Sequence, residues 1–146
     1  MPKICGEIVL KCSKEVAFNE ITSLDFTKKI DPNLDNLNIE ILFQNERFLR
    51  TLTKLGKFGN IDMEKIFIPE TFTIIAQRKP PMPPFVYFSG LQMLYDHKDG
   101  ALLKWVEEFE IDADNKSKEQ GIVSRFEQNE ILHFQKVQNY FNAGIK

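Results

Sequence analysis

The C-terminal part of the chain carries a helical pattern of apolar residues, which follows a series of strand-like patterns. Between Ser117 and Phe141, the residues that recur at steps of three and four share one helical face: Val123, Phe126, Glu130, Phe134, Val137 and Phe141. Only Glu130 interrupts this apolar face. A long amphipathic helix after a mostly β chain predicts a curved sheet wrapped around the helix, and that shape can enclose a cavity.

Alternation of apolar and polar residues predicts about seven strands, which cover residues 4–11, 38–44, 47–55, 60–68, 71–78, 85–95 and 101–111. Two short helices are expected after the first strand. Ser13 is the N-cap of one. The other covers 23–30 and ends at Asp31, because the following proline pushes that residue out of the helical region. The prolines within 79–84 cannot donate to a ladder, so this segment should be an exposed connection.

Length and composition narrow the class of protein. The 146 residues fit a single domain over 1–146 with its own core. The net charge of −2, with both signs mixed along the chain, argues against a nucleic-acid surface. No apolar run approaches the roughly 20 residues of a membrane span, and no signal peptide precedes the first strand. We therefore expect no membrane insertion and a cytoplasmic protein.

The two cysteines fit the same setting. Cys5 and Cys12 are seven positions apart, so they would point to opposite faces of one strand. A disulfide between them is not expected. Buried, reduced thiols in a reducing compartment are the interpretation that follows.

One acidic residue falls on an apolar strand face. Over 101–111, Glu107 shares its face with Trp105 and Phe109. An unpaired carboxylate in apolar surroundings is costly and its pKa rises, so Glu107 should be either functional or paired. Lys65 or a residue of the long helix could be the partner.

A lysine presents the same choice. Over 60–68, Lys65 shares an apolar face with Met63 and Phe67. Its ammonium could hold a carboxylate or enolate oxygen of a ligand. Alternatively, the side chain could extend to the mouth of the cavity and keep its charge in water.

Two further groups could move protons. Tyr87 lies on one face of 85–95 with Tyr95 and with three ligand-contact candidates, Ser89, Leu91 and Met93. Its hydroxyl could donate to a ligand carbonyl or shuttle a proton, or it could be structural. On the long helix, His133 follows Asn129 by four residues, so both face the same way. His133 could act as a general base near neutral pH, or be a solvated helix residue.

Several other chemistries lack their sequence signatures. No Cys and His spacing matches a zinc site, and the chain has no phosphate-binding loop, no nucleophile elbow and no dinucleotide fingerprint. We therefore expect neither a metal nor a cofactor.

The order of elements resembles the START-like, or Bet v 1-like (SRPBCC), superfamily, and most of all its polyketide aromatase/cyclase group. The resemblance rests on scattered segments along most of the chain, which are 7–10, 13–18, 84–87, 104–109 and 128–141. It implies an α+β helix-grip fold, with a curved antiparallel sheet of about seven strands around a long C-terminal helix. Two short helices would follow the first strand.

The resemblance also implies an activity. A polyketide aromatase/cyclase binds a poly-β-ketone chain in its cavity and promotes regiospecific ring closure by aldol cyclisation and dehydration. Lys65 stands where that group has a cavity arginine, and lysine keeps the charge without the planar five-donor fork. A tyrosine of some members is missing near 35–37.

In this interpretation Lys65 stabilises negative charge, while Tyr87, Glu107 or His133 moves protons. The ligand-binding candidates are Met63, Phe67, Ser89, Leu91, Met93, Trp105, Phe109, Phe126 and Asn129. The substrate would arrive on an acyl carrier protein, and the protein would be a monomer or a homodimer.

A non-catalytic carrier of a lipid, quinone or aromatic metabolite is the alternative. It needs an apolar cavity with few polar anchors and no group tuned toward neutral pH, whereas an enzyme needs at least one. A third interpretation is a regulatory protein of the same fold, which would use the stiff segment 80–84 to contact a partner.

Overall fold

The computed structural model describes residues 1–31, 38–54, 56, 59–80 and 83–144. Its elements are β1 (Lys3–Leu10), α1 (Lys14–Ile21), α2 (Phe26–Ile30), β2 (Asn38–Gln44), β3 (Phe48–Lys54), β4 (Asn60–Ile68), β5 (Thr73–Lys79), β6 (Phe85–His97), β7 (Gly100–Ile111) and α3 (Glu119–Asn142). The predicted end of α2 at 32–33, the segment 35–37 and part of the proline segment lie outside the described residues.

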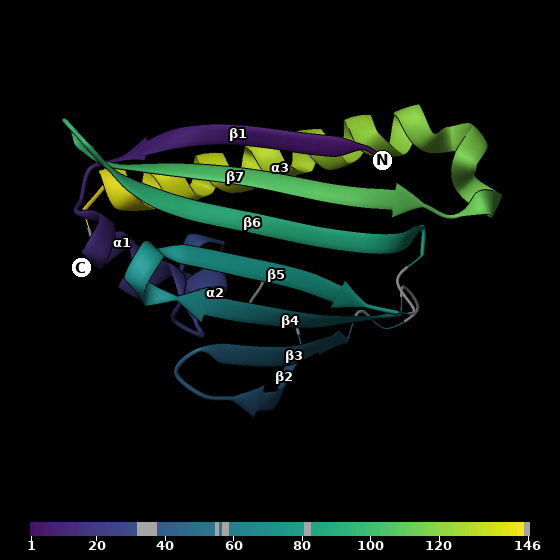
Figure 1. The fold of residues 1–146 in the computed structure, drawn as a ribbon, viewed down its shortest axis with the longest axis horizontal. Coiled ribbons are helices and arrows are strands. Elements are labelled where there is room, and N and C mark those ends of the chain that lie inside the picture. Colours follow the sequence, from purple (N-terminus) through teal and green to yellow (C-terminus); the bar gives the residue numbers. More distant parts are fainter. Residues whose placement is uncertain (32–37, 55, 57–58, 81–82, 145–146) are drawn as a thin grey trace.

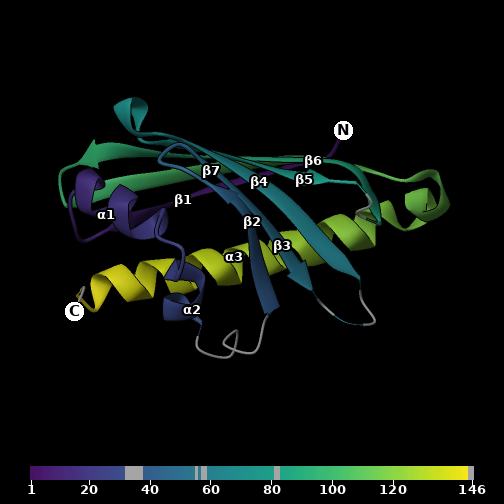
Figure 2. The same ribbon diagram turned by 90° about the horizontal axis from the view of Figure 1, so that it is seen from below.

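The strands form one antiparallel seven-stranded sheet in the order β1-β7-β6-β5-β4-β3-β2 (Figure 1). From β2 to β7, each strand pairs with the next along the chain, whereas β1 joins the far edge beside β7. Helix α3 runs along the concave side, behind β1 and β7 in Figure 1, while β2 and β3 curve round toward it in Figure 2. The predicted helix-grip α+β fold is confirmed.

Stacking of two aromatic rings fastens α3 to the sheet. Trp105 of β7 and Phe134 of α3 lie 3.7 Å apart between ring centroids, with 13° between their planes. The alternation expected on β7 is confirmed, because Leu103, Trp105, Glu107 and Phe109 all point inward and are buried. At the edge of the sheet, the Gln138 side chain of α3 donates to the Val9 carbonyl of β1 at 3.2 Å. Helix α3 therefore packs along the edge of the sheet that β1 forms.

The two short helices cover one end of the concave side. Ser13 caps α1 as predicted, since its Oγ accepts a hydrogen bond from the Val16 amide at 3.2 Å. Phe26, in α2, packs on Phe141 near the end of α3, with ring centroids 5.9 Å apart. This contact holds α2 against the long helix.

A bulge in β6 changes which residues of that strand face inward. Phe85 pairs with Ile111 and Tyr87 pairs with Glu110, so Val86 is an extra residue in the ladder. Because an extra residue reverses the alternation, Phe88 is buried, whereas Tyr87 is 38% exposed. The expectation that Tyr87, Ser89, Leu91 and Met93 face the cavity is therefore wrong: after the bulge, Gly90, Gln92 and Leu94 take the inward positions.

The cysteines are unpaired, as expected, but Cys5 is exposed rather than buried. It alternates with buried Ile4 on β1 and so lies on the convex face. Cys12 is partly buried, and burial raises the pKa of its thiol. None of the helices that the structure describes combines the length and the apolar composition of a membrane span.

Gly6 gives a direct test of the stack that fastens α3. A Cβ at Gly6 would lie 2.3 Å from the Trp105 ring, so Gly6→Ala must displace the indole from Phe134. We expect a loss of about 1–3 kcal/mol in the free energy of unfolding, measured with urea.

The matched control is Gly121→Ala, on the open side of α3, where the added Cβ meets no described atom within 4 Å apart from the nearby backbone of the helix itself. This change should stabilise the protein by up to about 1 kcal/mol, because alanine favours helix. An unchanged stability of Gly6→Ala would contradict the role given to the stack.

Candidate functional site

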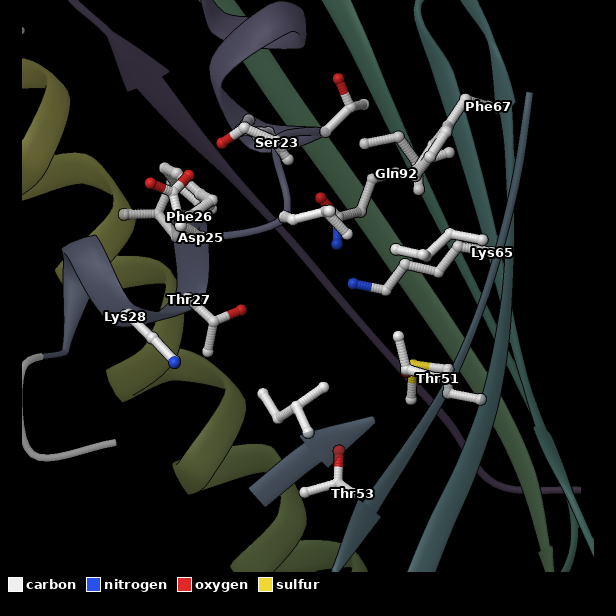
Figure 3. A pocket seen from close by; sticks show the side chains of 18 of the residues that line it. Ser23, Asp25, Phe26, Thr27, Lys28, Thr51, Thr53, Lys65, Phe67 and Gln92 are labelled. Carbon is white, nitrogen blue, oxygen red and sulfur yellow. The ribbon is translucent and has the colours of Figure 1, made fainter. Parts of the chain in front are cut away.

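A cavity of about 500 Å³ lies between α2, α3 and the concave face of the sheet (Figure 3). Its wall is mostly apolar and includes Leu49, Ile61, Met63, Phe67, Ile74 and Leu103 from the strands. Phe134 and Val137 of α3 line it on the helix side. This size and lining are typical of a site for a small, mostly apolar molecule.

Polar side chains gather where α2 faces the far strands. Ser23, Asp25, Thr27 and Lys28 belong to α2 and the residues before it. Figure 3 shows Thr27 and Lys28 on this side of the cavity. Thr51 and Thr53 of β3 line the cavity from the opposite side. A ligand would therefore meet hydroxyl groups and both signs of charge here.

Among the basic residues that line the cavity in the described part of the chain, Lys65 is the one whose amino group is fully buried. Its side chain extends from β4 into the open space, and its amino group lies on the side of Gln92 (Figure 3). Among the described residues, no hydrogen bond or ion pair to the Lys65 ammonium is formed. Burial lowers the pKa of Lys65, and no nearby carboxylate offsets this effect. Lys65 is therefore a buried amine without an acidic partner among the described residues, rather than a side chain that extends to the mouth.

His133 lines the same cavity from α3. Burial lowers the pKa of its imidazole, the negative charge of Glu130 opposes this shift, and the positive charge of Lys65 adds to it. Its ring also packs edge-on against Phe134, with centroids 5.0 Å apart. The imidazole is therefore neutral at neutral pH and able to accept a proton.

A cluster of three ionisable side chains lies near Lys65 and His133. It consists of Arg78 of β5, Glu107 of β7 and Glu130 of α3. Desolvation, a hydrogen bond with Glu130 and the charge of Glu130 together raise the pKa of Glu107 to about 9, while the charge of Arg78 opposes them. Glu107 is thus protonated at neutral pH. Of the two partners considered for Glu107, a residue of the long helix and Lys65, the structure therefore favours the helix residue, Glu130.

Arg78 connects this group to the cavity, which it lines. Its guanidinium lies over the rings of Phe88 and Phe85, at 4.6 Å and 5.6 Å from their centroids. Burial lowers the pKa of Arg78, and the charges of Glu107 and Glu130 oppose that shift. The positive charge of Arg78 therefore lies against two aromatic faces, within the field of Glu107 and Glu130.

The structure separates the residues that the sequence placed in one site. Met63, Lys65, Phe67 and His133 line the cavity together. Glu107 and Trp105 lie beside it on β7. The other candidates lie elsewhere. Phe109 and Phe126 belong to an aromatic cluster with Phe85 and Phe88, and Asn129 lines a surface groove with Phe126. Four residues of β6 lie on the convex face: Tyr87, Ser89, Leu91 and Met93.

Arg78 and Gln92 are among the cavity residues that the sequence analysis missed. Arg78 follows Ile74 by four residues on β5, so strand alternation alone places both on one face. Gln92 alternates with the predicted ligand contacts Leu91 and Met93, and the bulge at Val86, which brings it inward, has no clear sequence signal. Within the described residues, no group of three or more His, Cys, Asp or Glu side chains could hold a metal ion.

Solved structures of other proteins share this fold at low sequence identity. The Zhui aromatase/cyclase from Streptomyces sp. R1128 matches with a TM-score of 0.80, 12% identity and coverage of 99% of this chain and 96% of that one. TTHA0849 from Thermus thermophilus matches with a TM-score of 0.75 and 12% identity, and the match covers 99% of this chain and 100% of that one. The Aha1 dimer from Colwellia psychrerythraea matches with a TM-score of 0.71 and 15% identity, and the match covers 100% of both chains.

No protein-family model matches the sequence, and a search of curated proteins finds no match either. The structural matches, aromatase/cyclases among them, confirm the resemblance to Bet v 1-like (SRPBCC) proteins as a likeness of fold. It establishes the fold alone.

The protonated state of Glu107 makes stability depend on pH. The folded protein holds the Glu107 proton up to about pH 9, whereas an ordinary glutamate releases it near 4.5. Because the folded state binds more protons between these values, this contribution to stability is lost as pH rises. Glu107→Gln removes it. Relative to wild type, the unfolding free energy of Glu107→Gln should therefore rise from about pH 5 to about pH 9, by at most about 1.4 kcal/mol per unit.

Urea unfolding at several pH values measures this difference. Glu108→Gln is the control, because Glu108 lies on the convex side of the same strand and pairs with Lys3 at 3.6 Å with both side chains exposed. A constant difference between Glu107→Gln and wild type across this range would show that Glu107 is ionised in the folded protein.

Proposed function

We propose that the protein binds a hydrophobic small molecule that carries a carboxylate or enolate oxygen, and that Lys65 holds this oxygen. The observation that carries the proposal is the Lys65 ammonium, which lies in a mostly apolar cavity without an acidic partner among the described residues. A buried, unpaired charge destabilises the folded state. A ligand oxygen would supply the missing partner, and the apolar wall would bury the rest of the molecule.

Medium-chain acids and alcohols of equal length test this anchor. Isothermal titration calorimetry should show that decanoate binds more tightly than decanol, by roughly 10- to 100-fold, because a hydrogen bond to a charged group adds about 1.5–3 kcal/mol. Lys65→Met should remove this preference. It should also raise the melting temperature of the free protein, because it replaces a desolvated charge with an apolar chain.

Lys28→Met is the matched control, because it removes a cation from α2, on another wall of the same cavity. This variant should keep the preference for decanoate. Equal binding of decanoate and decanol by wild type, or an unchanged preference in Lys65→Met, would exclude Lys65 as the anchor.

Ring closure of a poly-β-ketone is the second candidate, and the pairing of Lys65 with His133 in one cavity favours it. Aldol closure needs a base that takes a proton from a carbon beside a carbonyl, and a cation that stabilises the enolate oxygen. The neutral His133 imidazole fits the first role, and Lys65 fits the second. Protonated Glu107 could supply a proton for the dehydration that follows. Tyr87 has no role here, since it lies on the convex face.

An acyl carrier protein would deliver such a substrate, and closure would then depend on the cavity holding one carbanion against one carbonyl. A carrier without catalysis uses the same cavity and the same anchor. Only a measurement of catalytic turnover distinguishes an enzyme from a carrier here.

A synthetic poly-β-ketone thioester gives the test of catalysis. Wild type should change the distribution of cyclised products relative to buffer, as measured by chromatography with mass spectrometry. His133→Leu should slow closure about 100-fold and keep the affinity for decanoate, because it removes the base and not the anchor. Products identical to those of the uncatalysed reaction would leave a carrier.

A further inference from the structure

The Lys65 amine can also avoid the cost of a buried charge by losing its proton. Its amino group extends into a cavity of about 500 Å³ with a mostly apolar wall (Figure 3). Burial lowers the pKa of Lys65, so a larger fraction of this amine is neutral at a given pH than in an exposed lysine. A neutral amine is a nucleophile, whereas an ammonium is not. The cavity therefore contains a primary amine that can attack a carbonyl carbon.

The other charged groups of the cavity wall do not favour the ammonium form. Asp25 is the acidic residue of this wall among the described residues, and its carboxylate pairs with Lys29 at 3.7 Å. Lys28 of α2 and Arg78 of β5 also line the cavity, and positive charges there disfavour another one. The surroundings of Lys65 therefore suit a neutral amine better than a charged one while no anion is bound.

His133 can move protons in the same cavity. It lines the cavity from α3, and the positive charge of Lys65 contributes to the lowered pKa of its imidazole, so the two groups lie within electrostatic reach. A neutral imidazole accepts a proton and the imidazolium returns it. The side chain of Gln92 lies on the same side of the cavity as the Lys65 amino group (Figure 3). Its amide could donate a hydrogen bond to an oxygen bound there.

We propose that Lys65 forms an imine with an uncharged aldehyde or ketone that enters this cavity. Its Nζ attacks the carbonyl carbon, so the C–N bond forms as the carbonyl π bond breaks. His133 carries the two amine protons to the oxygen in turn. The C–O bond then breaks, the oxygen leaves as water, and the nitrogen lone pair forms the C=N bond. This inference goes beyond the proposed function, because the ligand is neutral and a covalent bond replaces the ion pair.

The apolar wall favours the imine over its hydrolysis. Leu49, Met63 and Phe67 of the strands and Phe134 of α3 line the cavity. Such a wall limits the water that would reverse the reaction, and it buries the apolar part of the ligand. A cavity of about 500 Å³ is large enough for a small organic molecule. The ligand class is therefore an aldehyde or ketone on an alkyl chain or an aromatic ring.

Reductive trapping with decanal tests the proposal. Sodium cyanoborohydride converts an imine into a stable secondary amine, and peptide mass spectrometry identifies the lysine that carries it. At neutral pH, wild type should be labelled at Lys65 at least about 10-fold faster than at Lys98, because the cavity holds the aldehyde beside a partly neutral amine. Lys98 is an exposed lysine between β6 and β7, and it gives the reference rate within the same molecule. Equal rates at the two lysines would overturn the proposal, and this comparison needs no variant.

A variant and a competitor locate the reaction. His133→Leu should slow the labelling of Lys65 by about 10- to 100-fold, because it removes the group that moves the protons, and it should leave the rate at Lys98 unchanged. Labelling of Lys65 at the wild-type rate in this variant would overturn the role of His133. Decanoate should slow the labelling of Lys65 and not that of Lys98, since both ligands need the same cavity. Labelling of Lys65 that an excess of bound decanoate does not slow would place the reaction outside the cavity and overturn the proposal.

The ten-carbon ligands separate this inference from the anchor at Lys65. Fast labelling of Lys65 in a protein that binds decanoate and decanol equally keeps the nucleophile and removes the anchor. A preference for decanoate that depends on Lys65, with equal labelling of Lys65 and Lys98, keeps the anchor and removes the nucleophile. Equal labelling together with equal binding would overturn both.

Discussion

A single helix cannot cover the concave face of a seven-stranded sheet, and the cavity of this protein follows from that mismatch. The stack of Trp105 on Phe134 holds α3 against β7, and the contact of Gln138 with β1 holds it at the edge of the sheet. The strands on the other side, β2 to β4, curve round without a helix packed on them (Figure 2). Helix α2 closes part of this space, and the remainder is the cavity.

The cavity wall contains charges that weaken the fold. Lys65 is desolvated, and among the described residues it has no acidic partner, while Arg78 and Glu107 each leave a buried polar atom without a hydrogen bond. Apolar residues of similar volume would be at least as stable at such positions. Lys65 and Arg78 both line the cavity, and a ligand explains such costly groups better than packing does. The interpretation as a binding site therefore rests on the energy of the free protein as well as on its shape.

The sequence predicted the parts of this arrangement that repeat regularly. The apolar face of α3 and the alternation of β4 and β7 were enough to place Phe134, Lys65 and Glu107 on inward faces. Each of these segments keeps one period over nine residues or more, with only an occasional polar residue on the apolar face. Such patterns are the most reliable signals that a single sequence contains.

The bulge at Val86 explains the errors that the sequence analysis made on β6. Both faces of β6 carry aromatic residues, so nothing in the composition marks the point where the alternation reverses. One extra residue moved Tyr87, Ser89, Leu91 and Met93 to the convex face and brought Gln92 into the cavity. The partnership of Glu107 with Glu130 and Arg78 joins three elements, and only the folded structure brings those together.

The most direct test is a titration of Lys65 itself, by NMR of protein that contains lysine labelled with ¹³C at the ε carbon. Lys65→Arg identifies the signal by its loss. In the free protein, Lys65 should titrate below the range of the exposed lysines, because burial disfavours its charge. A bound aryl carboxylate should raise its pKa, because the ligand supplies the missing negative charge. A Lys65 signal that titrates with the surface lysines and does not respond to the carboxylate would contradict the account.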